Sequence, residues 1–131
     1  MKKRKIRVLI GKVGLDSHER GAKYIASILK NAGMEVVYVP RFKTHEAIIN
    51  TAIQEDVDVI GLSFLSQEYS YYVPKIIDGL KNKNLKDVTL ILGGNIFESD
   101  IPKMKSLGVK EVFTSGATPQ EIVSFINGVT A

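Results

Sequence analysis

The sequence predicts an α/β fold: a Rossmann-like, flavodoxin-like doubly wound sheet of five parallel strands in the order 2-1-3-4-5. Two observations predict it. Short apolar runs alternate five times with amphipathic helical stripes, which is typical of parallel strands covered by helices on both faces. The length of 131 residues suits one domain. Right-handed crossovers leave few topologies for such a chain, and the order 2-1-3-4-5 is a common one.

The first strand is predicted at residues 6–10 and is followed by a loop at 11–20. The next helix is expected at 21–31, because apolar residues recur there on one face. Gly33 follows as a signal that the helix stops.

The second strand is expected at residues 35–39 and should end at Pro40. Thr44 is a candidate N-cap for a helix that runs through Glu55. An apolar run at 58–63 then predicts the third strand.

A third helix is expected at about 69–81, where Pro74 predicts an irregular or late start. The remaining elements are a strand at 88–92, a short helix at 98–106, a strand at 109–113 and a last helix. That helix begins with a capping signature in which Thr118 is the N-cap, Pro119 stands at N1 and Glu121 at N3.

The composition excludes several classes of function. Without cysteine there are no disulfides, thiolate zinc sites, iron–sulfur clusters or cysteine nucleophiles. No apolar run reaches the roughly 18–20 residues that span a bilayer, and the N-terminal apolar stretch is too short for a signal peptide. We therefore expect a cytoplasmic protein without a membrane partner.

The net charge of +4 comes largely from a basic cluster at residues 2–5. Residues 1–5 are expected to form a solvated basic tail, and residues 6–131 a single domain. Nucleic-acid binding would need a basic face with interleaved aromatics or a recognition helix. Neither is visible, so no nucleic-acid partner is expected.

Ligands of such sheets bind at the carboxyl ends of the strands, which directs attention to the loops after strands 1, 3 and 4. The loop after strand 1 lacks the spacing of a phosphate-binding P-loop and of a dinucleotide-binding glycine motif. It carries Asp16-x-His18-x-x-Gly21, preceded by Lys12. A lone histidine cannot hold a free metal ion, but it can be an axial ligand to a metal held by a macrocycle. A neighbouring carboxylate can fix its tautomer and raise its basicity.

Three motifs in order carry a resemblance to a known family: Asp16-x-His18-x-x-Gly21, Ser63-x-Leu65 and Gly93-Gly94. Together they resemble the signature of the cobalamin (vitamin B12)-binding domain of adenosylcobalamin-dependent mutases. The stretches 14–23 and 54–63 look most like the methylmalonyl-CoA mutase and 2-hydroxyisobutyryl-CoA mutase branch. The resemblance covers nearly the whole chain, from Ile6 to Gly128.

The resemblance implies a role for each matching residue. His18 would replace the cofactor's own dimethylbenzimidazole as the lower cobalt ligand, with Asp16 and Lys12 as the relay behind it. Ser63 would hydrogen-bond the displaced benzimidazole. The cofactor-binding residues implied are Lys12, Asp16, Ser17, His18, Arg20, Gly21, Gly61, Ser63, Leu65, Ser66, Gly93, Gly94, Phe113, Ser115 and Gly116.

The implied function is the cobalamin-binding small subunit of a two-component acyl-CoA mutase, an isomerase that is inactive alone. Its partner would be a large barrel subunit that binds the acyl-CoA substrate. Three departures from the family pattern, Ser17, residues 67–69 and Asn95, leave the acyl-CoA substrate open. The alternatives are a corrinoid carrier for methyl transfer and a non-enzymatic cobalamin sensor or chaperone.

Overall fold

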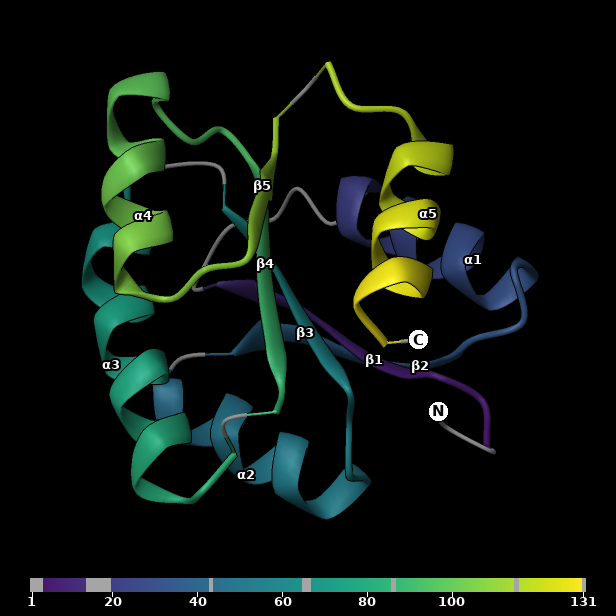
Figure 1. The fold of residues 1–131 in the computed structure, drawn as a ribbon, viewed down its shortest axis with the longest axis horizontal. Coiled ribbons are helices and arrows are strands. Elements are labelled where there is room, and N and C mark those ends of the chain that lie inside the picture. The colour runs from purple at the N-terminus through teal and green to yellow at the C-terminus, as the bar shows by residue number, and fades with distance from the viewer. Residues whose placement is uncertain are drawn as a thin grey trace.

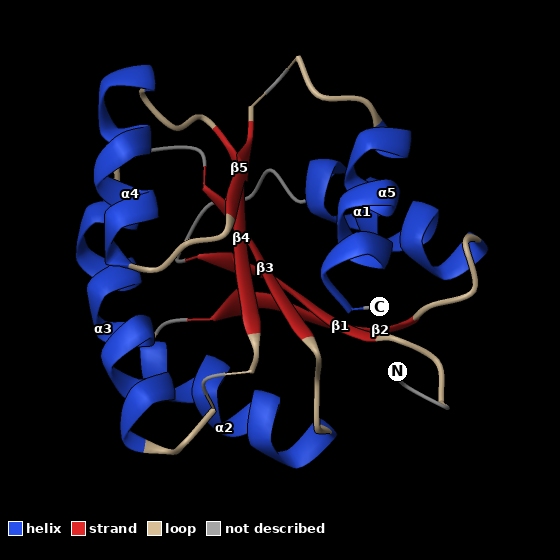
Figure 2. Ribbon diagram, in the orientation of Figure 1, coloured by secondary structure: helices blue, strands red, loops and turns tan. Residues whose placement is uncertain are grey.

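The computed structural model describes residues 4–13, 20–42, 44–64, 67–85, 87–114 and 116–130. Five parallel strands form one sheet in the order β2-β1-β3-β4-β5. This confirms the predicted fold class and strand order. Figure 1 and Figure 2 show helices on both faces, with α1 and α5 on one side and α2, α3 and α4 on the other.

The elements alternate along the chain as the periodicity predicts. Their bounds are β1 (Arg7–Val13), α1 (Arg20–Asn31), β2 (Glu35–Phe42), α2 (His45–Glu55), β3 (Val59–Phe64), α3 (Tyr69–Asn82), β4 (Thr89–Gly94), the 3₁₀ turn η1 (Glu98–Asp100), α4 (Ile101–Leu107), β5 (Glu111–Phe113) and α5 (Pro119–Thr130). Among the described residues, no helix is both long and apolar enough to cross a membrane.

Alternate residues of each central strand point into two separate cores. Leu9, Ile60 and Leu92 face α2, α3 and α4, and belong to the larger buried cluster. Val8 and Ile91 face α1 and α5 in the second cluster. The carboxyl ends of the strands are therefore held between two packed layers of helices.

Strands β1 and β4 extend further toward the carboxyl edge than the sequence predicts, and β3 extends one residue further, to Phe64. β1 continues through Val13, so Lys12 lies in the strand rather than in a loop. β4 likewise includes Gly93 and Gly94, which the sequence placed in a loop. Both extensions are stabilised by pairing, because Lys12 pairs with β3 and the two glycines pair with the end of β3.

β2 also continues past Pro40, contrary to the prediction that it ends there. The strand lies at the edge of the sheet, where a proline without an N–H costs least. The register of β1 against β2 also shifts between Gly11 and Val13. Two β2 residues, Pro40 and Arg41, therefore face one residue of β1, and this irregularity accommodates the proline.

Helix α3 runs from Tyr69 to Asn82, which agrees with the predicted range of about 69–81, and Pro74 does not delay its start. The helix buries Val73, Ile76 and Leu80 against the sheet, and this burial offsets the one backbone hydrogen bond that Pro74 cannot make. Two predicted caps are confirmed. Thr44 accepts the N–H of Ala47 at 3.2 Å, and Thr118 accepts that of Glu121 at 3.2 Å.

Candidate functional site

The structure describes nine of the fifteen predicted site residues. Six of the residues lie outside the described ranges: Asp16, Ser17, His18, Leu65, Ser66 and Ser115. Arg20 is the first residue of α1, and Gly21 follows it. The described residues of the site come from β1, β3, β4 and β5, and from the segments that leave their carboxyl ends.

One row of the sheet brings four of these residues together. Lys12 of β1 is the register partner of Ser63 of β3. Ser63 is the partner of Gly93 of β4, and Gly93 is the partner of Phe113 of β5. Residues in register on parallel strands about 4.8 Å apart point to the same face. The row therefore forms a continuous strip across the sheet near its carboxyl edge.

The row faces α1 and α5. Ile10 and Ile91, two positions earlier on their strands, belong to the core cluster under those two helices, as does Phe113. Side chains two residues apart on a strand share a face. The site is consequently on the α1/α5 side of the sheet.

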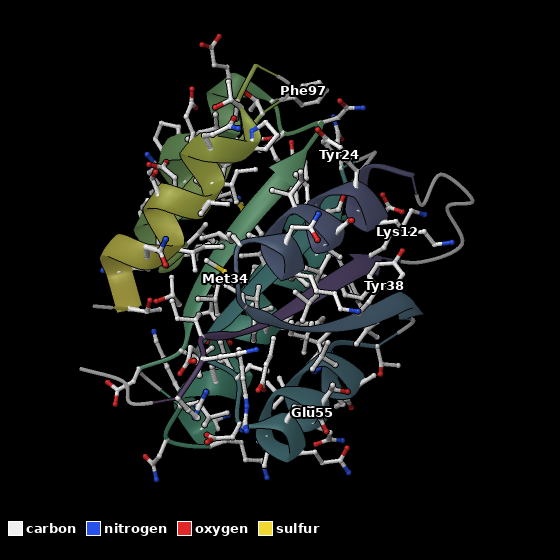
Figure 3. The ribbon with its side chains drawn as sticks, turned by 90° about the vertical axis from the view of Figure 1, so that its right-hand side faces the viewer. Lys12, Tyr24, Met34, Tyr38, Glu55 and Phe97 are labelled. Carbon is white, nitrogen blue, oxygen red and sulfur yellow. The ribbon has the colours of Figure 1, made fainter. Side chains whose placement is uncertain are left out.

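Lys12 is 2% exposed, which is unusual for a lysine. A buried ammonium is costly unless a polar or charged group accompanies it. Figure 3 shows Lys12 near the carboxyl end of β1, with Tyr38 of β2 labelled close by. In the strip, the buried Lys12 thus stands next to two small residues, Ser63 and Gly93, which occupy little space.

The glycines of the site are not alike. Among the described residues, a Cβ on Gly93 would meet only the carbonyl oxygen of Phe113, at an ordinary 3.5 Å, and a Cβ on Gly21 or Gly116 would have no heavy atom within 4 Å. In contrast, a Cβ on Gly61 would lie 3.0 Å from Cδ1 of Ile10. Within the part of the chain that the structure describes, a Cβ would therefore fit at Gly93 and at the surface-exposed Gly21 and Gly116, whereas the space over Gly61 is already filled by the core.

Gly94 has a backbone reason to be glycine. Its φ is +100°, and a Cβ there would overlap the carbonyl oxygen of Phe64. The N–H of Asn95 donates to that same oxygen at 2.8 Å. Gly94 therefore makes the turn that attaches the end of β4 to the end of β3.

A buried tyrosine fixes the segment after this turn. Tyr69, the first residue of α3, is fully buried, and its hydroxyl donates to Oδ2 of Asp100 at 2.6 Å. The same hydroxyl accepts the N–H of Phe97 at 3.2 Å. Burial raises the pKa of Tyr69, and its hydrogen bond to Asp100 raises it further. The sequence alone does not predict this contact, because only the fold brings Asp100 beside Tyr69.

The ionic residues gather at the opposite edge of the sheet. Asp58, just before β3, is buried and accepts the N–H of Arg7 at 2.9 Å and a guanidinium hydrogen bond from Arg4 at 3.1 Å. Arg7 also donates to Glu35 at 2.8 Å, and this hydrogen bond raises the pKa of Arg7. These pairs join the amino ends of β1, β2 and β3, and they stand apart from the candidate site.

Comparison with known proteins agrees with the motifs. The family model described as the B12 binding domain matches residues 6–124. The 2-hydroxyisobutanoyl-CoA mutase small subunit of Aquincola tertiaricarbonis is 44% identical over 126 residues, covering 96% of this chain and 93% of that protein. The pivalyl-CoA mutase small subunit of Xanthobacter autotrophicus is 39% identical, covering 96% of this chain and 84% of that protein.

A solved structure supports the fold. A cobalamin-binding protein from Desulfitobacterium hafniense superposes with a TM-score of 0.82 at 16% identity, over 98% of this chain and 60% of that one. At this identity the likeness concerns the fold alone. The family model and the two mutase small subunits, which match nearly the whole length, establish the family: the chain belongs to the B12-binding domains, in the branch of the adenosylcobalamin-dependent acyl-CoA mutases.

Proposed function

We propose that the chain is the small subunit of a cytoplasmic two-component acyl-CoA mutase and holds adenosylcobalamin base-off, with His18 as the lower ligand of cobalt. The observation that carries this proposal is the strip of Lys12, Ser63, Gly93 and Phe113. The three motifs follow or end β1, β3 and β4, and the strip brings residues of these three strands together at one edge of the sheet. The chain also belongs to the B12-binding family.

The strip supports the cofactor on physical grounds. The nucleotide tail of cobalamin needs space that side chains do not fill, and the half-buried Gly93 leaves such space beside Ser63 among the described residues. Ser63 is half-buried at the same level and offers a hydroxyl for the displaced benzimidazole. The residues that are described therefore fit the tail of the cofactor.

We infer that His18 is the cobalt ligand from its position in the sequence, between β1 and α1. β1 ends at Val13 and α1 begins at Arg20, so His18 and Asp16 belong to the short connection between them. Asp16 would accept the hydrogen bond of the second imidazole nitrogen of His18, and Lys12 would moderate the charge of Asp16. The remaining contacts to the cofactor are proposed for Ser17, Arg20, Leu65, Ser66, Gly94 and Ser115. Gly61 is left out of this set, because Ile10 already fills the space beside it.

Adenosylcobalamin, when bound, supplies the radical that starts a carbon-skeleton rearrangement. The part of this chain is to bind the cofactor, orient it at the carboxyl edge and exclude water beneath it. The substrate-binding barrel would belong to a large subunit. The relatives are named for 2-hydroxyisobutanoyl-CoA and pivalyl-CoA, so a branched acyl-CoA is the proposed class of substrate.

The test is electron paramagnetic resonance of cob(II)alamin bound to the wild-type chain and to His18→Ala. We expect hyperfine splitting from one axial nitrogen in the wild type, and its loss in the variant. His45→Ala is the matched control, because His45 begins α2 on the other face of the sheet. A signal in which the cofactor's own benzimidazole stays on cobalt would contradict the mutase mode and favour a corrinoid carrier or a sensor.

A further inference from the structure

Exposed aromatic side chains are concentrated at one edge of the molecule. Among the described residues, four large hydrophobic side chains are exposed: Tyr24 at 55%, Ile53 at 45%, Tyr71 at 61% and Phe97 at 54%. A single exposed apolar residue is normal on a protein surface. Their placement in the fold is what distinguishes the three aromatics from Ile53.

Each of the three aromatics follows the carboxyl end of a strand. Tyr24 lies in the first turns of α1, Tyr71 lies in the first turn of α3, and Phe97 lies between β4 and η1. Ile53 instead lies near the end of α2, which runs back toward the amino edge. In Figure 3 Tyr24 and Phe97 lie toward the end to which the β4 arrow points, and Glu55 lies at the other end.

Two of these side chains stand on a rigid support. The backbone of Phe97 is fixed by its hydrogen bond to the buried Tyr69 hydroxyl. The ring of Tyr71 packs edge-on against Tyr72 with 5.1 Å between centroids, and Nζ of Lys75 lies 4.9 Å from its centroid. Aromatic side chains that are already ordered lose little entropy when a partner binds them.

We propose that Tyr24, Tyr71 and Phe97, which we call the aromatic rim, form the surface on which the large mutase subunit docks. This rests on the proposed function, which places cobalamin on the same edge. The subunit that carries the substrate must reach the exposed face of the cofactor, so it must cover this edge. Two relatives that match nearly the whole chain are named as small subunits, and tyrosine and phenylalanine are enriched in the buried centres of protein–protein interfaces.

The experiment measures association with a defined probe, the large subunit that accompanies the A. tertiaricarbonis small subunit, in the presence of saturating adenosylcobalamin. The variants are Tyr24→Ser, Tyr71→Ser and Phe97→Ser, and Ile53→Ser is the matched control at the opposite edge. Dissociation constants come from isothermal titration calorimetry. The cob(II)alamin spectrum of each variant alone shows that its fold and cofactor site are intact.

We expect Tyr71→Ser and Phe97→Ser each to weaken association about tenfold or more, as truncated interface hot spots do, with Ile53→Ser unchanged. Unchanged dissociation constants in all rim variants would overturn the proposal. An equal loss of affinity for the large subunit in Ile53→Ser would also overturn it. Self-association of the chain that depends on the rim, without an effect on the large subunit, would assign the surface to a second copy instead.

The two proposals fail separately in this design. A wild-type chain that shows the His18-dependent nitrogen signal but does not bind the large subunit overturns the rim and leaves the cofactor site standing. A wild-type chain that binds no cobalamin overturns the proposed function, and the rim with it.

Discussion

The hydroxyl of Tyr69 and the carboxylate of Asp100 form a 2.6 Å hydrogen bond that joins the start of α3 to the end of η1. The same hydroxyl holds the N–H of Phe97, and the ring of Tyr69 packs edge-on against Phe64 at 5.9 Å. The segments that leave β3 and β4 are thus fastened to each other just beyond the Gly94 turn. These are the two segments that follow the Ser63 and Gly93 motifs.

Tyr69→Phe should destabilise the fold without changing its core volume. The substitution leaves the N–H of Phe97 without its hydroxyl acceptor and Asp100 without its donor, which costs about 1–3 kcal/mol for groups removed from water. Urea unfolding of the wild type and the variant measures the difference. Tyr71→Phe is the matched control, because that tyrosine is exposed. Equal free energies of unfolding for Tyr69→Phe and the wild type would contradict the structural role.

The same tyrosine predicts a dependence on alkaline pH. Burial first, and then the hydrogen bond to Asp100, raise the pKa of Tyr69 above the ordinary tyrosine value of 10.0. Above pH 10 the unfolded chain therefore releases this proton before the folded chain does, and the stability declines as pH rises. Tyr69→Phe should show a shallower decline above pH 10 in urea titrations. Parallel curves for the two proteins would show that the hydroxyl is not buried.

An acid-side dependence is expected from Glu111 at the start of β5. The hydrogen bond from Lys105, at 2.9 Å, lowers the pKa of Glu111. Its stabilising contribution is therefore present above about pH 4.5, and it is lost as pH falls through the lower folded-state pKa. Because both side chains are partly exposed, Glu111→Gln should cost at most about 1 kcal/mol at pH 7. The difference from the wild type should vanish at the lowest pH, and a constant difference would contradict the pair.

Gly93→Ala separates cofactor binding from folding. A Cβ at Gly93 makes only an ordinary 3.5 Å contact in the protein itself, so the free energy of unfolding should change by less than about 1 kcal/mol. If the nucleotide tail lies over this strand, the added methyl group should weaken cobalamin binding about tenfold. Gly128→Ala in α5 also has open space around it and should leave the affinity unchanged. Spectroscopic titration with cobalamin measures both, and equal affinities would remove Gly93 from the slot.

Asp58→Ala tests the ion pairs at the amino ends of β1, β2 and β3, at the edge of the sheet opposite the candidate site. Asp58 is buried and accepts hydrogen bonds from the Arg7 N–H and the Arg4 guanidinium, so its loss should destabilise the chain by about 2–3 kcal/mol. Arg4→Ala should cost less, because Arg4 is partly exposed and Asp58 keeps the backbone donor. Cobalamin affinity at temperatures where the fold persists should not change. A reduced affinity in Asp58→Ala would show coupling between the two edges.

Most of the fold could be predicted from periodicity, because apolar alternation records which faces are buried. The errors occurred where pairing overrides local signals. Gly11, Lys12, Gly93 and Gly94 look like loop residues in sequence, yet each is held in a strand by neighbours distant along the chain. Pro40 looks like a strand end, but an edge strand with a register shift tolerates it.

The sequence by itself determined the alternation of strands and helices, the capping of α2 and α5, and the three ordered motifs that mark the family. These depend on nearest neighbours and on spacing, which are written along the chain. Only the tertiary structure decided which residues share one row of the sheet, namely Lys12, Ser63, Gly93 and Phe113. It also decided that the space beside Gly61 is occupied by the core while the space beside Gly93 is not. The burial of Tyr69 against Asp100 likewise depends on the tertiary structure. Those relationships arise from register and packing between distant segments, which no local pattern records.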